Sequence, residues 1–281
     1  MPLEPLPHID TRWMFRPVSG ELVTLLRQLT PADWQQPTVA GAWLVRDVVA
    51  HLVDTALRRL SFDRDGMTPP PPAEPIASAR DFVAFINRLN AQWVTAAQRL
   101  SPRVLTDLYA LASSGQADWF ERQPLDGPAL FSVSWAGETS SANWFDIGRE
   151  FTELWHHQQQ IRMAVRAASL EEARFLHAVL DIAVRGLPYA YRDVLAAPGH
   201  TVVVDVSGPS GGRWTLVSDG ARWTLFGGEP VAETARVRLD QDLAWKVLFN
   251  AAGGPETAAS VHITGNADLA SALLRARSVI V

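Results

Sequence analysis

The sequence predicts two domains, an all-helical N-terminal domain and a small α+β C-terminal domain. Up to about residue 195, apolar residues recur mostly at helical spacing. After the turn-forming residues 196–200, short runs rich in β-branched residues follow, bounded by Gly, Ser and Asp. We therefore expect domains at residues 1–197 and 198–281. A chain of 281 residues is long enough for both.

In the first domain, apolar stripes predict helices over residues 8–29, 44–63 and 78–100, then a helical turn from 101 to about 111. Residues 112–141 are rich in Gly, Ser, Asp and Pro and are expected to form a connection. Because so long a connection is unusual in a compact domain, we expect it to line a site, with Phe120, Arg122 and Trp135 as candidate substrate contacts. Further helices are predicted over 144–162 and 170–195.

In the second domain, the pattern predicts strands over residues 201–206, 212–218, 222–226 and 235–239. Asp219-Gly220 is a strong hairpin signal between two of them. A helix over 243–251, a strand over 260–264, a helix over 268–275 and a short terminal strand over 278–281 complete the expected order.

Composition excludes several classes of function. The formal net charge is -5, and the 25 basic and 30 acidic residues are mixed along the chain, so no nucleic-acid partner is expected. Neither a membrane-length apolar run nor a signal-peptide layout is present, which predicts a cytoplasmic protein without membrane association. There is no cysteine, so disulfides, Cys-ligated metals and a Cys nucleophile are excluded, and thiol chemistry would need an external thiol.

The segment 144–162 contains a candidate pair of metal ligands. Glu153 and His157 are four residues apart, so they lie on the same helix face and can share one divalent cation. An ordinary surface pair is the alternative, and two ligands are not enough. His156 is the rival ligand, but a Glu-x-x-His site of the di-iron type needs a second such motif, which the chain lacks. On a helical wheel His157 also lies closer to the apolar face than His156, so we interpret His156 as pointing outward and His157 as the better ligand. His51 alone reads as an ordinary helix-surface histidine.

Three segments taken together resemble a known family. They are WLVRDVVAHL at 43–52, the stretch from Arg149 through ELWHH to Arg162, and the C-terminal VHITGNADLA at 261–270 with RSVIV at 277–281. In order and spacing they resemble the mycothiol-dependent maleylpyruvate isomerase family, within the DinB/YfiT-like superfamily. The resemblance implies a DinB-like four-helix bundle as the N-terminal domain and a sterol-carrier-like C-terminal domain.

The same resemblance implies a metal site formed by His51, Glu153 and His157. Two imidazoles and a carboxylate with an open position fit catalytic zinc, although nickel, iron or manganese also bind such ligands. One position departs from the family pattern, because Gln160 stands where the family often has an Asp that supports the second histidine. This departure leaves open how the metal is tuned and which reaction is native.

The resemblance further implies a low-molecular-weight thiol, such as mycothiol, as cofactor for isomerising a maleylpyruvate-like cis-unsaturated acid. The substrate is anionic, so an arginine clamp is expected, with Arg222 as the catalytic candidate and Arg213, Arg122 and Trp135 as binding candidates. Alternatives on the same scaffold are a thiol S-transferase and a metal hydrolase. An alternative of another class is a non-enzymatic carrier of a small molecule or lipid.

Overall fold

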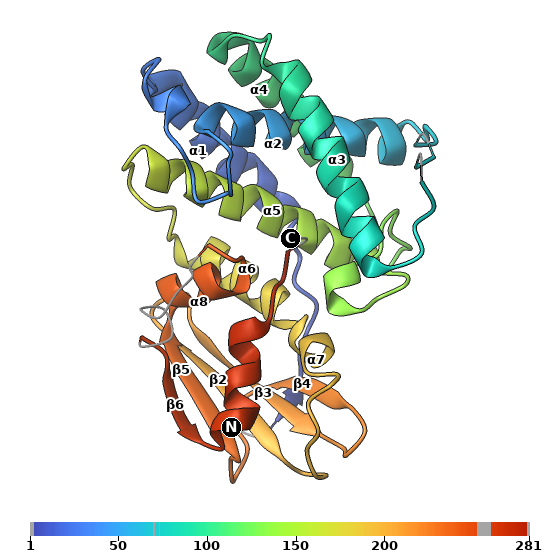
Figure 1. Ribbon diagram of the computed structural model, residues 1–281, viewed down its shortest axis with the longest axis vertical. Helices are drawn as coiled ribbons and strands as arrows, with labels where there is room; N and C mark the ends of the chain where they lie inside the picture. The colour runs from blue at the N-terminus through green and yellow to red at the C-terminus, as the bar shows by residue number, and fades with distance from the viewer. Residues whose placement is uncertain (1–2, 70, 73, 252–259, 280–281) are drawn as a thin grey trace. The chain divides into compact units, whose positions relative to one another are not determined.

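The computed structural model describes residues 3–69, 71–72, 74–251 and 260–279 (Figure 1). It contains two compact units. The helical unit comprises Thr11–Pro124 and Glu153–Ser169, and the sheet unit comprises Met1–Asp10, Leu125–Thr152 and Leu170–Ile280, as far as these residues are described. A helical N-terminal region and a separate sheet-containing C-terminal part are thus confirmed. The compact units divide the chain differently from the border expected at 197/198, which stays a prediction about separable domains.

In the helical unit, a 3-10 turn at Arg12–Met14 leads into α1 (Phe15–Gln28). Pro17 lies in the first turn of α1, where its missing N–H costs nothing, so the helix starts later than predicted. The helices α2 (Val45–Arg59), α3 (Ala79–Ala97) and α4 (Pro102–Phe120) follow, and α2 packs against both α3 and α4. The end of α5 (Asn143–Ala164) also belongs to this unit.

Helix α4 corrects one prediction, because it continues nine residues beyond the expected end at 111. A Cβ atom at Gly115 would lie 3.2 Å from Cδ1 of Leu60, so this glycine allows close packing instead of making a turn. Ser113 is buried in the helix, with its hydroxyl on the Ala110 carbonyl. Small residues that suggested a loop are therefore packing residues.

The described part of the sheet unit contains one six-stranded sheet with the order β1-β4-β3-β2-β5-β6. Strands β2 and β5 are parallel, and the other pairs are antiparallel. The Asp219-Gly220 hairpin is confirmed, with Gly220 at a φ of 94°. The strands are β1 (Glu4–Pro5), β2 (Thr201–Ser207), β3 (Gly212–Ser218), β4 (Trp223–Gly227), β5 (Ala235–Asp240) and β6 (His262–Gly265).

The sheet unit also contains short helices. The helix predicted over 170–195 is divided into α6 (Ala173–Val184) and α7 (Leu187–Ala190) around Gly186, against which the ring of Trp135 packs. Helices α8 (Gln241–Leu248) and α10 (Ala267–Ser271) match the later predictions, and α6 packs against α8. The terminal strand expected at 278–281 falls partly outside the described residues.

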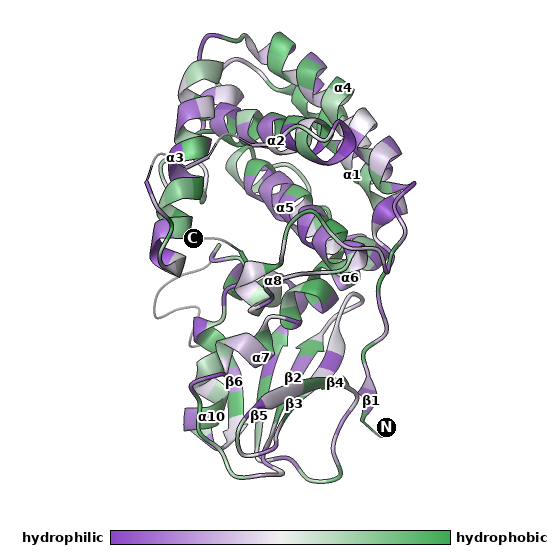
Figure 2. Ribbon diagram, turned by 90° about the vertical axis from the view of Figure 1, so that its right-hand side faces the viewer, coloured by the Kyte–Doolittle hydropathy of each residue, from purple (hydrophilic) through white to green (hydrophobic). Residues whose placement is uncertain are grey.

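Many polar residues of α5 are buried. Figure 2 shows hydrophilic colour along much of α5. Gln158, Gln159 and Gln160 are nonetheless buried, and Gln158 donates a hydrogen bond of 2.9 Å to the Val18 carbonyl on α1. Buried polar groups need such partners, so this helix is held by a hydrogen-bond network as well as by apolar contacts.

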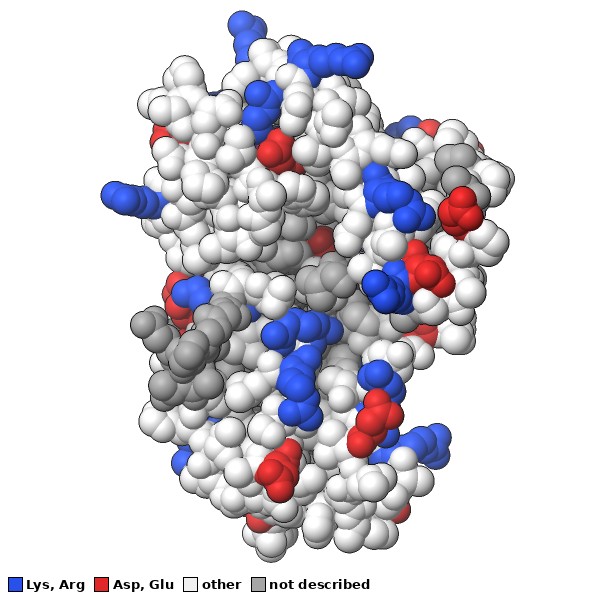
Figure 3. Space-filling view, in the orientation of Figure 1, with Lys and Arg blue, Asp and Glu red and all other residues white. Residues whose placement is uncertain are grey.

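Charged side chains of both signs occur on the face of each unit that Figure 3 shows. Among the described helices, none combines the length and the apolar character that a membrane span requires.

Candidate metal site

Two helices of the helical unit bring His51, Glu153 and His157 together; we call these three residues the ligand group. Helix α2 carries His51, and its start is fixed by Asp47, whose carboxylate accepts the Leu44 N–H at 3.0 Å. The indole N–H of Trp93 on α3 donates to the Ala50 carbonyl at 2.8 Å, which ties the turn before His51 to its neighbour.

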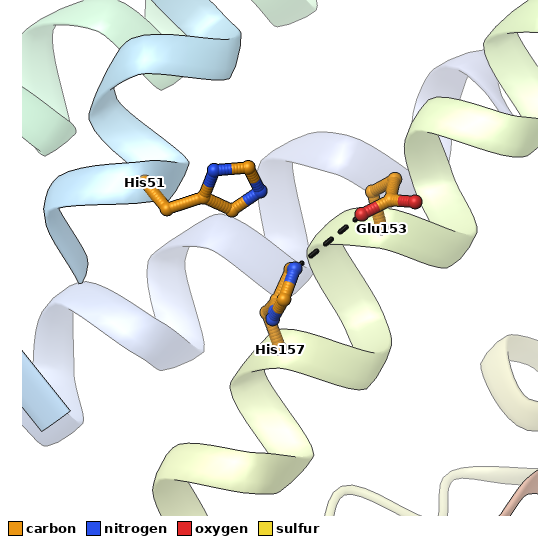
Figure 4. A group of neighbouring side chains, drawn as sticks. All are labelled: His51, Glu153 and His157. Atoms are coloured by element: carbon orange, nitrogen blue, oxygen red, sulfur yellow. Dashed lines mark ion pairs between the residues drawn. The ribbon is translucent and has the colours of Figure 1, made fainter. Parts of the chain in front are cut away.

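The ligand group converges on one point. One ligand atom from each residue lies within 4.8 Å of the others, and Figure 4 shows the His51 ring directed towards Glu153 and His157. Nε2 of His157 lies 3.4 Å from a Glu153 carboxylate oxygen, and the rings of His51 and His157 are 4.8 Å apart edge to face. Two imidazole nitrogens and one carboxylate oxygen at this separation fit a divalent cation such as zinc.

Gln160 orients His157. The side-chain oxygen of Gln160 lies 2.8 Å from Nδ1 of His157, and both residues are buried. A carbonyl oxygen accepts only, so Nδ1 carries a proton and donates it to Gln160, and Nε2 is the ring nitrogen that faces Glu153. Gln160 therefore occupies the supporting position that the sequence assigned to it, as a neutral acceptor instead of a carboxylate.

His51 is buried and incompletely satisfied. Its Nδ1 has no hydrogen-bond partner among the described residues, a state that costs about 1–3 kcal/mol for a buried polar group. Burial, and next the neighbouring His157, lower the pKa of His51 well below its usual value, so its imidazole is neutral at physiological pH. A neutral, buried and partly unpaired imidazole is the form that binds a metal.

Glu153 is ionised in this environment. Burial alone would raise the pKa of Glu153, but the hydrogen bond from His157, and next the electrostatic interaction with the neighbouring histidines, outweigh it and lower that pKa. The ligand group therefore presents one negative charge beside two imidazoles, the charge pattern of a site for a dication.

His156 corrects another prediction. It was expected to point outward, but it is only 2% exposed, and its ring centroid lies 4.1 Å from that of His157. The helical wheel misplaced His156 because this part of α5 is buried on several sides. The converging ligand atoms come from His157, and His156 packs beside them.

Trp43 lies beside the ligand group, although no function was predicted for it from the sequence. Its ring centroid is 5.0 Å from that of His51 and 6.3 Å from that of His157. It belongs to a loop that is joined at Pro37 and Leu44 by an isolated β-bridge, directly before α2. No spacing rule could have identified it, because the contact depends on how this loop returns to the helix.

The other candidates of the 112–141 segment do not join the ligand group. Phe120 is fully buried against Phe15, at 4.9 Å between ring centroids, and is a core residue. Arg122 is exposed in the turn after α4. Trp135 lies in the sheet unit, half-buried, with its ring 5.7 Å from that of Phe145.

Arg213 and Arg222 also belong to the sheet unit. Arg222 is exposed in the turn before β4, where its backbone N–H donates to the Asp219 carboxylate at 2.7 Å. Arg213 pairs with Asp205 at 3.1 Å and with Glu229 at 3.2 Å. Arg213 is one member of a surface network, which we call the arginine cluster: Asp205, Arg213, Glu229, Glu233, Arg236 and Arg238.

The sheet unit also contains a pocket of about 580 Å³. Its walls come from the N-terminal strand, the start of α5, the α6–α7 region and β4. Aromatic and aliphatic side chains dominate the lining, with Glu138, Arg185 and Thr224 as its polar members. Pockets of this size and character accept small organic molecules.

Comparison with known proteins gives the family. Residues 15–162, more than half of the chain, match the model of the mycothiol maleylpyruvate isomerase N-terminal domain. A crystal structure of the mycothiol-dependent maleylpyruvate isomerase is similar with a TM-score of 0.53 at 12% identity, over 86% of this chain and 88% of that one. A histidine-to-alanine mutant of the mycothiol-dependent maleylpyruvate isomerase gives a TM-score of 0.55 at 14% identity, over 92% and 93% of the two chains.

These structural likenesses show a shared fold, and no curated protein matches the chain in sequence. The family match covers α1 to α5 up to Arg162, and so it includes every residue of the ligand group. The chain therefore belongs to the mycothiol maleylpyruvate isomerase N-terminal domain family.

Proposed function

We propose that this protein is a metal- and thiol-dependent isomerase of a cis-unsaturated acid similar to maleylpyruvate. The observation that carries the proposal is the convergence of three ligand atoms within 4.8 Å, inside the segment that matches the family. The chain has no cysteine, so the thiol is an external compound, and mycothiol is the one that the family name indicates. As part of the proposal, the helices form a DinB-like four-helix bundle and the C-terminal domain is sterol-carrier-like.

The residues of the ligand group have distinct tasks in this proposal. His51 and His157 offer ring nitrogens, that of His51 neutral, and Glu153 offers a negative oxygen. Gln160 keeps the proton of His157 on Nδ1, so that Nε2 stays available. When bound, a divalent cation supplies the positive charge that lowers the pKa of a coordinating thiol.

The isomerisation regenerates the thiol and consumes no other reactant. The thiolate sulfur forms a C–S bond to the activated double bond, whose π electrons move onto the conjugated carbonyl group as an enolate. Rotation about the resulting single bond follows. The enolate then restores the double bond, now trans, as the C–S bond breaks and releases the thiolate.

The substrate carries carboxylates, for which arginine is the usual partner. Arg222 is the first candidate because its side chain is exposed and the arginine cluster does not include it. Arg122, also exposed, is the second. Arg213 must leave two carboxylates to bind a substrate, which makes it the weakest of the three.

The test is an isomerisation assay on zinc-loaded protein with maleylpyruvate and mycothiol. The change in ultraviolet absorbance monitors the reaction. We expect activity that requires the thiol, and His51→Ala should reduce kcat/KM by at least about 100-fold because a ligand is removed. His8→Ala, which changes an exposed histidine of the sheet unit, is the matched control and should keep full activity. Isomerisation that needs no thiol, or that survives in His51→Ala, would contradict the proposal.

The same site has two alternative activities, transfer of the thiol to an electrophile and hydrolysis by a metal-activated water. Adding thiol together with an electrophile that has no cis–trans isomer tests for thiol transfer. Supplying an amide substrate without thiol tests the second. Either activity in the absence of isomerisation would replace the isomerase assignment while keeping the ligand group.

The pocket in the sheet unit favours a second candidate function, the binding of a small apolar molecule. A fluorescent apolar probe should bind to the full-length protein with a defined stoichiometry. Phe226→Asp, which places a charge in the pocket wall, should weaken that binding while leaving the metal content unchanged. Equal probe binding by the variant would remove this candidate.

A further inference from the structure

Trp43 and Glu153 are more exposed than the two histidines of the ligand group that they adjoin. His51 and His157 are 6% and 7% exposed, whereas Trp43 is half-buried and the Glu153 side chain keeps 16% of its surface. An external molecule that binds beside the imidazoles can therefore contact these two partly exposed side chains. Of the two, only the indole offers an extended apolar surface.

The backbone of Trp43 is held by hydrogen bonds within its loop. The carbonyl oxygen of Trp43 accepts hydrogen bonds from both the backbone N–H and the hydroxyl of Thr38, at 3.0 and 2.7 Å. The Trp43 N–H donates to the Ala40 carbonyl at 3.2 Å, and Gly41 supplies the positive φ of 63° that the tight loop needs. A loop closed in this way fixes the backbone from which the indole projects beside the histidines.

The ring lies against both histidines, tilted by 45° to His51 and by 33° to His157. It is not placed to coordinate a cation, because an indole N–H only donates. The indole can instead contact an external atom that binds beside the imidazoles. A polarizable sulfur gains from contact with an aromatic ring, whereas a water molecule loses hydrogen-bond partners next to one.

We infer that Trp43 is a specificity-determining residue of this site, whose indole contacts the external sulfur compound and favours a thiol over water as the additional ligand. The inference rests on the proposed function and makes it narrower. It explains how one donor set can serve thiol chemistry instead of hydrolysis, which the three ligand residues alone do not decide.

The test uses the full-length protein loaded with cobalt(II) and titrated with N-acetylcysteine as the probe thiol. The sulfur-to-cobalt charge-transfer absorption reports thiol binding without any turnover. Trp43→Ala should bind one cobalt like the wild type but should weaken thiol binding by about 2- to 10-fold, the range of a sulfur–aromatic contact. Trp43→Phe keeps an aromatic face and should stay within about twofold of the wild type.

Trp13→Ala is the matched control, because Trp13 is a tryptophan of the same unit with 46% of its surface exposed. It should leave the thiol affinity unchanged. An unchanged thiol affinity in Trp43→Ala overturns the inference, and so does loss of cobalt from that variant, which would make the indole a support for the ligands. A wild-type protein that binds no cobalt overturns the proposed metal site itself, an outcome distinct from the other two.

Discussion

The ligand group and the arginine cluster both gather charged or titratable side chains, but they are satisfied to different degrees. In the arginine cluster, Arg236 donates to Glu233, Asp205 and Glu229 at 2.7, 2.9 and 2.8 Å. Burial alone would raise the pKa of Asp205, but hydrogen bonds from three arginines lower it. Each charge there has a partner of opposite sign, so the cluster is complete without a ligand.

The ligand group is incomplete by the same measure. It holds an ionised carboxylate with two imidazoles but no arginine or lysine, and one buried ring nitrogen of His51 has no partner among the described residues. Convergent polar groups that satisfy one another are structural, whereas convergent groups that stay partly unsatisfied are poised to bind something. This difference, more than the residue types, separates a candidate site from a surface network.

The largest expected effect is a loss of metal affinity when Gln160 is changed. Gln160→Ala removes the acceptor that orients His157, and the loss of such a supporting contact lowers metal affinity by about 10- to 100-fold. Competition with a chromophoric chelator measures it. Gln159→Ala is the matched control, because Gln159 is also buried on α5 but bonds Ser169 at 2.6 Å. Equal affinities in the two variants would show that the Gln160 contact does not support the metal.

A smaller effect, on the free energy of unfolding, is expected when the arginine cluster is disrupted. Arg236→Met leaves three carboxylates without their shared partner, and we expect the free energy of unfolding to fall by about 1–3 kcal/mol at neutral pH. Urea denaturation at constant m-value measures this change. Metal content should not change, because the cluster belongs to the sheet unit. A variant that loses its metal would contradict the separation of the two groups.

The smallest effect is a pH dependence from His51. The pKa of His51 is lowered in the folded state. Below about pH 6.5 this imidazole is therefore protonated in the unfolded chain but stays neutral in the folded chain. Stability of the metal-free protein should therefore decrease as the pH falls from about 7 to about 5.5, by up to about 1.4 kcal/mol per pH unit from this residue. Urea unfolding at several pH values should show a flatter profile for His51→Gln. His8→Gln, at an exposed site, should retain the wild-type slope.

Those parts of the fold that depend on local sequence pattern could be predicted from the sequence. The β2–β5 strands and the Asp219-Gly220 hairpin follow from alternation and turn chemistry, and the i, i+4 spacing identified Glu153 with His157. Strand β1 was missed, because two residues carry no periodicity and the pairing of Glu4 with Gly227 depends on the fold.

Burial was the harder property to predict. His156 and the glutamines of α5 are polar yet buried, since their partners lie on distant segments such as α1. The contact of Trp43 with His51 likewise needs the three-dimensional course of a loop. His51 itself joined the site only through the family resemblance, because nothing in its local sequence separates it from a surface histidine.

The most direct test of the account is the metal content of full-length protein purified without chelator or affinity tag, measured by elemental analysis beside His157→Ala. We expect about one divalent ion per wild-type chain and none in the variant, because removing one of three protein ligands leaves too few. No bound metal in the wild type, even after reconstitution with zinc, cobalt, nickel, iron or manganese, would contradict it.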